Sequence, residues 1–268
     1  MKRIVFILGI IASMLFGDDP CIGEGKTTLK FEKKYPYNVV VKKYRYEDGC
    51  GIQKETLDIF QDDNKIDTIS EIYGVDLLND SDMNNDGKIE LVISGHSGGF
   101  GTDTHKIAVV EPNMKLSFEF KGDKIRLVDI DKDNDLELLT YKSVFFCISS
   151  EFCSHGTSLV ITIASKFKDY HLVLDKEATA ILKQDVGLPC QIDVIQNSGA
   201  ITFSNKNCAE NNLLLLGYDM LINDIDNLKK DLKYFSFDSK QAEEIFKQEI
   251  LKGIHYEVTK EVKNVLIR

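Results

Sequence analysis

The chain has 268 residues, with 33 Lys and Arg against 43 Asp and Glu, so its formal net charge is −10. An acidic excess of this size argues against sequence-independent binding of nucleic acid or of an anionic membrane, because both need a basic face. With 43% hydrophobic residues and only four Pro, the chain is neither disordered nor fibrous, and its length fits one large domain or one domain with an appendage.

The first 17 residues have the layout of a secretory signal peptide. Lys2 and Arg3 form a basic start, Ile4–Phe16 is an apolar run, and the small Gly17 precedes the polar Asp18. The apolar run is short for a membrane span, so a buried helix or a membrane anchor is the less favoured interpretation. We expect cleavage after Gly17, a periplasmic or secreted mature protein, and no membrane insertion after signal cleavage. The mature chain would keep 31 basic and 43 acidic residues.

Short alternating or apolar runs, separated by turn residues, predict strands through much of the chain. In chain order these are Thr28–Glu32, Asn38–Arg45, Glu55–Phe60, Lys65–Glu71, Ile89–Ser94, Lys106–Glu111, Lys115–Phe120, Lys124–Val128, Leu136–Tyr141 and Ser158–Ala164. Strands of this length and spacing predict a mainly β fold, either a propeller-like domain or an irregular repeat β domain. We place this β domain at residues 18–210.

Two acidic segments repeat one pattern, with oxygen-bearing side chains at positions 1, 3, 5 and 9 of a loop that leads into an apolar strand. The candidate metal ligands are Asp82, Asn84, Asp86 and Glu90 in the first loop, and Asp129, Asp131, Asp133, Asp135 and Glu137 in the second. The second loop begins 47 residues after the first, and a similar strand, turn and strand precede each. The pattern therefore predicts an internal β repeat.

Calcium prefers six to eight oxygen ligands, and alternate residues of a tightly curled loop turn toward one centre. Position 6 must reverse the chain with a positive φ, which suits Gly87 and is tolerated by Asn134. The two loops therefore predict two calcium sites. The first has fewer carboxylates, so we expect it either to bind more weakly or to need a further ligand from Asp80 or a backbone carbonyl. Asp135, at position 7, is expected to contribute its backbone carbonyl. The alternative is that each segment is only an acidic surface turn.

The stretch Gly95–Gly101 follows the first loop and contains a second motif. Gly95-His96-Ser97-Gly98-Gly99 matches G-x-S-x-G, the nucleophile elbow of serine hydrolases, with His171 or His255 as the candidate base. An elbow opens onto a helix, whereas the residues that follow are rich in Gly and Thr and lead into a predicted strand. A serine hydrolase is therefore the alternative function, and a non-enzymatic protein is favoured.

Six cysteines remain after removal of the signal, and an even number in an exported chain predicts disulfides. The preferred pairs are Cys147 with Cys153, Cys190 with Cys208 around a predicted hairpin, and Cys21 with Cys50 by elimination. A zinc site is disfavoured because the chain has no C-x-x-C and its histidines are scattered.

Helical spacing appears toward the C-terminus, and we assign residues 211–268 to a mainly helical segment. Asp224–Tyr234 and Gln241–Lys252 are the predicted helices, and either Asp238 or Ser239 is expected to cap the second. The apolar residues of this segment are expected to pack on the β domain.

The two acidic loops resemble the calcium loops of FG-GAP and VCBS repeats, which occur in the β-propellers of integrin α-subunits and in bacterial exported proteins. The family pattern is D-x-[DN]-x-D-G-x-x-[DE]-L before an apolar strand, and both loops fit it except that Asn134 replaces Gly. The resemblance covers roughly Glu55–Glu177, and the chain is too short for a seven-bladed propeller at this period.

The resemblance implies an exported calcium-binding module that works by binding rather than catalysis. Similar repeats occur in periplasmic inhibitors of lysozyme-type enzymes. The expected partner is therefore an unknown protein or glycan of the cell envelope, with a lysozyme-like hydrolase among the candidates. The loop Gly95–Gly101 is the expected partner surface, because rigid scaffolds commonly present function on loops.

Overall fold

The computed structural model describes residues 25–48, 53–99, 102–114, 116–144, 148–149, 152, 159–197, 200–252 and 259–267. The predicted signal peptide, His255 and four of the cysteines lie outside these residues. The chain forms two compact units. The first contains the residues up to Asp82 together with Asp86–Asp123, and the second contains Met83–Asn85 together with the residues from Lys124 onward.

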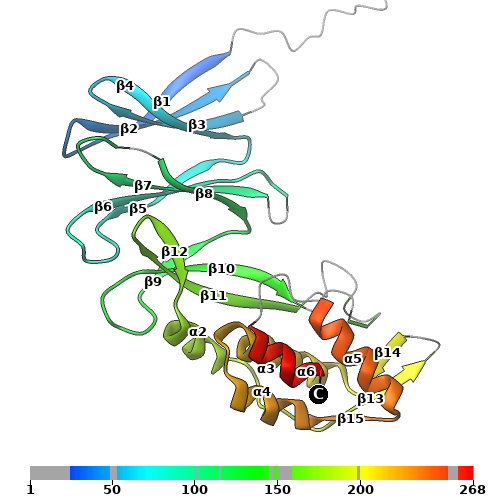
Figure 1. Cartoon of the computed structure of the whole chain (residues 1–268). Helices are drawn as coiled ribbons and strands as arrows, with labels where there is room; N and C mark the ends of the chain where they lie inside the picture. The colour runs from blue at the N-terminus through cyan, green and yellow to red at the C-terminus, as the bar shows by residue number, and fades with distance from the viewer. Residues whose placement is uncertain are drawn as a thin grey trace, which may run out of the picture. The chain divides into compact units, whose positions relative to one another are not determined.

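Three four-stranded sheets follow one another along the chain, each made of strands that are consecutive in sequence and antiparallel (Figure 1). The first unit holds β1 (Lys26–Tyr35), β2 (Val39–Glu47), β3 (Gln53–Gln61) and β4 (Asn64–Glu71), and then β5 (Val75–Ser81), β6 (Ile89–Gly95), β7 (Asp103–Val110) and β8 (Leu116–Gly122). The second unit holds β9 (Arg126–Val128), β10 (Glu137–Val144), β11 (Leu159–Lys168) and β12 (His171–Leu174).

The predicted mainly β fold is confirmed, since strands make up 47% and helices 26% of the structure. Each of the ten predicted strands is present, and β5, β12 and the short β15 (Phe235–Phe237) are additional strands that the sequence patterns did not indicate. The repeat is also visible in the topology, because each acidic loop joins the first two strands of a four-stranded sheet.

The core of the first unit lies between its two sheets. Alternate residues of the central strands point inward, which buries Val39 and Val41 on β2 and Leu91 and Ile93 on β6. Met114 closes this core from the turn after β7. The arrangement holds β6, and therefore the ends of the loops before and after it, on a rigid support.

The second unit combines its antiparallel sheet with helices and a small mixed sheet. The small sheet consists of β13 (Ile192–Asn197), β14 (Ala200–Phe203) and β15 (Phe235–Phe237), and β15 runs parallel to β13. The helices are α2 (Lys176–Lys183), α3 (Lys206–Ile222), α4 (Ile225–Asp231), α5 (Lys240–Lys252) and α6 (Lys260–Ile267), with the short 3₁₀ helix η2 (Leu232–Tyr234) after α4. Helical structure thus begins before residue 211, with α2 and the start of α3.

The helices share one large core with β11 and the small sheet. Phe203, Phe235 and Phe237 surround the fully buried Phe246 of α5, whose ring centroid lies 4.7 Å from that of Phe235. Burial of aromatic rings contributes most to a core of this kind. Of the two predicted capping residues of α5, Ser239 is the cap, because its Oγ accepts the backbone N–H of Ala242 at 3.1 Å.

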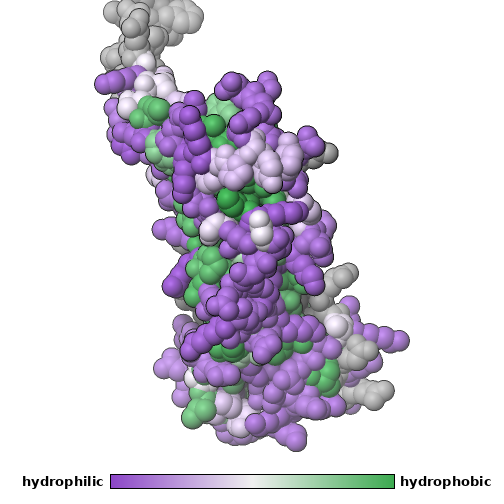
Figure 2. Space-filling model, turned by 90° about the vertical axis from the view of Figure 1, so that its left-hand side faces the viewer, coloured by the Kyte–Doolittle hydropathy of each residue, from purple (hydrophilic) through white to green (hydrophobic). Residues whose placement is uncertain are grey.

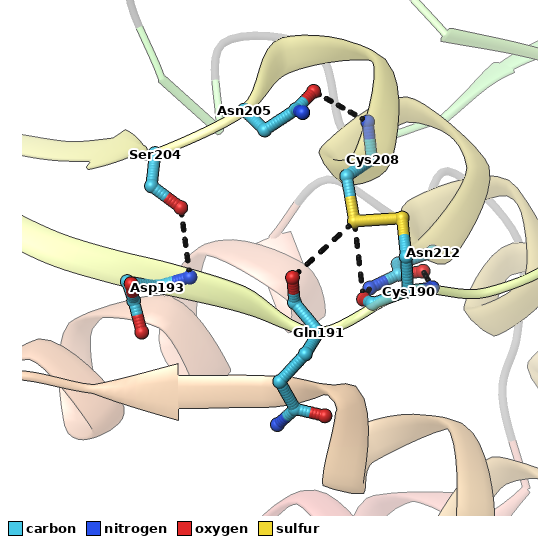
Figure 3. The surroundings of a disulfide bond; sticks show 7 residues. All are labelled: Cys190, Gln191, Asp193, Ser204, Asn205, Cys208 and Asn212. Atoms are coloured by element: carbon cyan, nitrogen blue, oxygen red, sulfur yellow. Dashed lines mark hydrogen bonds between the residues drawn. A yellow bond between two sulfur atoms is a disulfide. The ribbon is translucent and has the colours of Figure 1, made fainter.

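The predicted disulfide between Cys190 and Cys208 is present, with a Cα–Cα distance of 5.8 Å (Figure 3). It encloses the predicted hairpin, here β13 and β14, and ties the start of α3 to the segment before β13. Asn212 supports the same corner, because its side chain bonds both the N–H and the carbonyl of Cys190. A crosslink over a loop of this length contributes roughly 3 kcal/mol to stability.

Hydrophilic side chains cover most of the face shown in Figure 2, with small hydrophobic areas between them. Among the described residues, no helix combines the length and the apolar character needed to cross a membrane. A disulfide is typical of proteins in oxidising compartments.

Candidate metal centre

The two acidic loops occupy equivalent places in their sheets. The first joins β5 to β6, and the second joins β9 to β10. The residue before each loop pairs with the glutamate at position 9, Ser81 with Glu90 and Val128 with Glu137. Each glutamate therefore lies at the start of a strand, as the second residue of β6 and the first of β10, directly beside the start of its loop. Both glutamates are fully buried.

The backbone curls in the same way in both loops. Position 6 has a positive φ, +86° at Gly87 and +74° at Asn134, as the sequence predicts. Position 4 does too, with +54° at Asn85 and +63° at Lys132, which the sequence did not indicate. Two left-handed residues two positions apart wind the loop tightly enough for alternate side chains to face inward.

Carboxylate side chains stabilise the tightly turned backbone of each loop by accepting N–H groups of the same loop. The position-1 carboxylate accepts the position-6 N–H in each loop, from Gly87 to Asp82 at 2.8 Å and from Asn134 to Asp129 at 3.1 Å. The position-5 carboxylate accepts the position-7 N–H, as Asp133 does from Asp135 at 2.9 Å. In the first loop both oxygens of Asp82 accept local N–H groups, because Oδ1 also accepts the N–H of Asp86 at 3.2 Å. In the second loop the bond from Asn134 uses only Oδ2 of Asp129.

The second loop brings three carboxylates together. Oxygens of Asp129, Asp131 and Glu137 lie within 4.8 Å of one another, and this is the one such set of three among the described residues. Glu137 Oε2 accepts the N–H of Ile130 at 2.7 Å, but the buried Oε1 has no hydrogen bond, and neither has the buried Oδ1 of Asp129. Burial raises the pKa of Glu137, because removal from water disfavours the charged form of its carboxyl group.

Lys166 is the main feature of this centre that the sequence patterns did not reveal. Its ammonium lies 3.3 Å from Asp131, 2.5 Å from Asp133, 2.9 Å from Asp175 and 3.7 Å from Glu137. Burial opposes its charge, but hydrogen bonds to three carboxylates outweigh burial and raise the pKa of Lys166 above its usual range. The same contact lowers the pKa of the Asp133 carboxyl.

The first loop uses its polar residues differently. Asn84, at position 3, donates its amide N–H to the carbonyl of Phe167 at 3.1 Å, and Asn85 donates to the carbonyl of Asn134 and to the Asp135 side chain. The side chain of Asp135 therefore accepts a hydrogen bond from the Asn85 amide. Asp80, next to this loop, binds Lys33 and Tyr35, and the Lys33 ammonium lowers its pKa.

The G-x-S-x-G motif lies between two antiparallel strands. The chain leaves β6 at Gly95 and enters β7 at Asp103, so the elbow's helix is replaced by a strand. Ser97 Oγ bonds the Thr102 hydroxyl, and the Ser97 N–H donates to Asp103 at 3.0 Å. The candidate base His171 lies on β12 in the other unit.

His96 clamps this Gly-rich turn. Its Nδ1 lies 3.0 Å from Asp103 and its Nε2 lies 3.1 Å from Asp76. A carboxylate only accepts, so both ring nitrogens must donate, which requires the charged imidazolium. Burial disfavours that charge, but the bonds to Asp103 and Asp76 outweigh burial and raise the pKa of His96.

An exposed aromatic residue stands beside the same turn. Tyr73 is 69% exposed and its neighbour Ile72 is 58% exposed, in the connection between β4 and β5. The Tyr73 N–H donates to the carbonyl of His96 at 3.1 Å. Gly98 has a φ of +80°, and a Cβ added there would lie 2.2 Å from the Tyr73 ring. Arg45, Ile72 and Tyr73 are among the residues that line a polar pocket of about 360 Å³.

Comparisons with protein-family models, with curated proteins and with solved structures find no match for this chain.

Proposed function

We propose that this protein is an exported calcium-binding β-repeat protein that acts as a binding module for a protein or glycan of the cell envelope. The observation that carries the calcium assignment is the buried Glu137 Oε1, which lacks a hydrogen bond and lies beside carboxylate oxygens of Asp129 and Asp131. A buried carboxylate is costly unless a cation or donors surround it. The donor set fits calcium, which binds oxygen ligands almost exclusively.

In this proposal, the second loop holds an ion through Asp129, Asp131, Asp133 and Glu137, with a backbone carbonyl of Asp135. The first loop, through Asp82, Asn84, Asp86 and Glu90, holds a second ion more weakly. The ions act structurally, since they neutralise carboxylates that the fold gathers and so favour the folded state over the unfolded chain. The periplasm or the extracellular medium supplies calcium and permits the disulfide.

The partner surface in this proposal is the Gly-rich turn after β6 together with the exposed Ile72 and Tyr73. An aromatic ring that is exposed yet fixed in place offers a flat surface at low entropic cost, and polar groups beside it supply hydrogen bonds. Both features suit a glycan or an extended peptide. The clamp by His96 and the close fit of Gly98 against Tyr73 support a preorganised surface.

A thermal unfolding experiment tests the calcium assignment. We expect calcium, added after treatment with EGTA, to raise Tm, and the double substitution Asp131→Ala and Asp133→Ala to remove most of that rise. Asp63→Asn is the matched control, because Asp63 is an exposed turn acid outside both loops. An unchanged Tm on adding calcium to the wild-type protein would contradict the assignment.

The partner is tested by capture from a periplasmic or secreted fraction, with purified lysozyme-like hydrolases and cell-envelope glycans as defined ligands. Tyr73→Ala is expected to weaken capture, whereas Tyr170→Ala, on the turn between β11 and β12, serves as an exposed aromatic control. The hydrolase alternative predicts labelling of Ser97 by a fluorophosphonate, lost in Ser97→Ala. We expect no such labelling, because a strand follows the motif.

A further inference from the structure

Lys166 places its ammonium group against carboxylates of the second loop. It lies on β11, paired with Val173 of β12, and its ammonium reaches across to the loop between β9 and β10. Three of its four carboxylate partners, Asp131, Asp133 and Glu137, belong to the proposed calcium site. The fourth, Asp175, belongs to the start of α2.

The oxygens that Lys166 holds are the ones that an ion needs. Asp131 Oδ1 accepts the N–H of Asp133, and Asp133 Oδ1 accepts the N–H of Asp135. Lys166 takes the remaining oxygen, Oδ2, of both residues. Calcium contacts its ligands at 2.3–2.6 Å, so a divalent ion and an ammonium group cannot share both oxygens.

Asp175 gives the ammonium a second anchor outside the loop. Its Oδ2 lies 2.9 Å from Lys166 Nζ, while its Oδ1 caps α2 by accepting the N–H of Ala178 at 2.9 Å. This carboxylate is held in place by the helix whatever the loop binds. A flexible lysine side chain can therefore leave Asp131 and Asp133 and stay paired with Asp175.

We propose that Lys166 is a tethered cation that competes with calcium for the second loop. In the metal-free protein, its ammonium bridges Asp131, Asp133 and Asp175 and keeps the loop closed. Calcium coordinates the loop only when the ammonium withdraws to Asp175, so Lys166 sets the calcium affinity. The inference rests on the proposed calcium function of this loop.

Substitutions on each side of the competition test it by calcium titration calorimetry and by Tm in EGTA and in calcium. Lys166→Met removes the competitor and is expected to tighten calcium binding by about tenfold or more, because a positive charge leaves the site. The same variant is expected to lower Tm in EGTA and to enlarge the rise in Tm on adding calcium. Lys168→Met is the matched control, since Lys168 is exposed on the same strand and makes no ion pair among the described residues.

Asp175→Asn tests the second anchor with the helix cap retained, because Asn caps helices as well as Asp does. It removes the charge to which Lys166 withdraws, so calcium binding is expected to weaken severalfold, the opposite direction to Lys166→Met. Equal calcium affinities in the wild type, Lys166→Met and Lys168→Met would overturn the competition while the calcium function stood. Calcium binding by none of these proteins would overturn the calcium function, and the competition with it.

Discussion

The two acidic loops are alike in backbone and unlike in charge. Both lie between the first two strands of a sheet, both have positive φ at positions 4 and 6, and both end in a fully buried glutamate. The second loop places three carboxylates within 4.8 Å and faces Lys166, whereas the first places an amide at position 3 that bonds the carbonyl of Phe167. Loop shape follows from local bonds, but the capacity for a cation depends on how many carboxylates converge.

In the proposed function, this difference predicts that the two loops bind calcium with different affinities although their residue spacing is the same. A curled loop that satisfies its own N–H groups is stable without a metal, because position 1 caps position 6 in each case. A cation becomes more favourable where more carboxylate oxygens converge, as those of Asp129, Asp131 and Glu137 do.

The largest effect is expected at the glutamates of position 9. Glu137→Gln should weaken calcium binding at the tighter site by more than about 100-fold, because it removes a full charge from the ligand set. In EGTA the same variant should raise Tm, since a neutral amide is easier to bury than a carboxylate of raised pKa. Calorimetry and thermal unfolding measure both.

Glu90→Gln is the matched substitution in the first loop, and it should weaken calcium binding at the second loop by less than about tenfold. Equal losses for Glu90→Gln and Glu137→Gln would contradict the distinction between the loops.

Asn84→Asp makes the first loop resemble the second. In EGTA it should lower the free energy of unfolding by about 1–3 kcal/mol, because the carbonyl of Phe167 loses its donor and faces a carboxylate. In calcium the loss should shrink, since the loop gains a fourth acid. Urea unfolding in both buffers measures the difference, and a loss that calcium leaves unchanged would show that position 3 does not reach the ion.

Position 6 tests the shared backbone. Gly87→Ala should cost about 1 kcal/mol, since a Cβ at positive φ is strained even though nothing lies within 4 Å of it. Asn134→Gly should change stability by less than about 0.5 kcal/mol, because Asn tolerates this conformation. Urea unfolding of the two variants in EGTA compares these effects. A larger cost for Asn134→Gly than for Gly87→Ala would mean that the Asn134 side chain has a further role.

The smallest effect concerns pH at the turn that follows the first loop. The raised pKa of His96 means that its ion pairs with Asp103 and Asp76 stabilise the fold below about pH 6.5 and are lost as pH rises through the folded-state pKa. The loss should stay below about 1 kcal/mol, because Asp76 is solvent-exposed. Asp103 has a lowered pKa, and its contribution is lost only in acid.

Hydrogen exchange of the Ser97 amide, which bonds Asp103, should therefore speed up with pH beyond its intrinsic rate, and His96→Asn should remove that excess. Burial of the neighbouring His105 lowers its pKa, so its shift is opposite to that of His96. A Ser97 amide that responds to calcium but not to pH in this way would show that the metal, rather than His96, fixes the turn.

Local patterns accounted for much of the fold. Alternation marked ten strands, and the pair Cys190 and Cys208 marked the hairpin between them. Strand β5 (VDLLNDS) was not predicted, because it is a polar edge strand with little alternation of apolar and polar residues. Helix α3 was not predicted, because its own apolar residues are distributed around the helix and form no amphipathic stripe in the sequence.

Local sequence is sufficient to predict the two acidic loops. Their ligand spacing, the chain reversal at position 6 and the entry into a strand all depend on residues within nine positions of each other. The side chains that face the second loop are brought there by the folding of distant segments. Lys166 and Asp175 reach the second loop through the pairing of β10, β11 and β12, and no periodic pattern encodes that contact. Electrostatic contacts depend on distance in space, and sequence spacing determines that distance only within a turn, a helix or a strand.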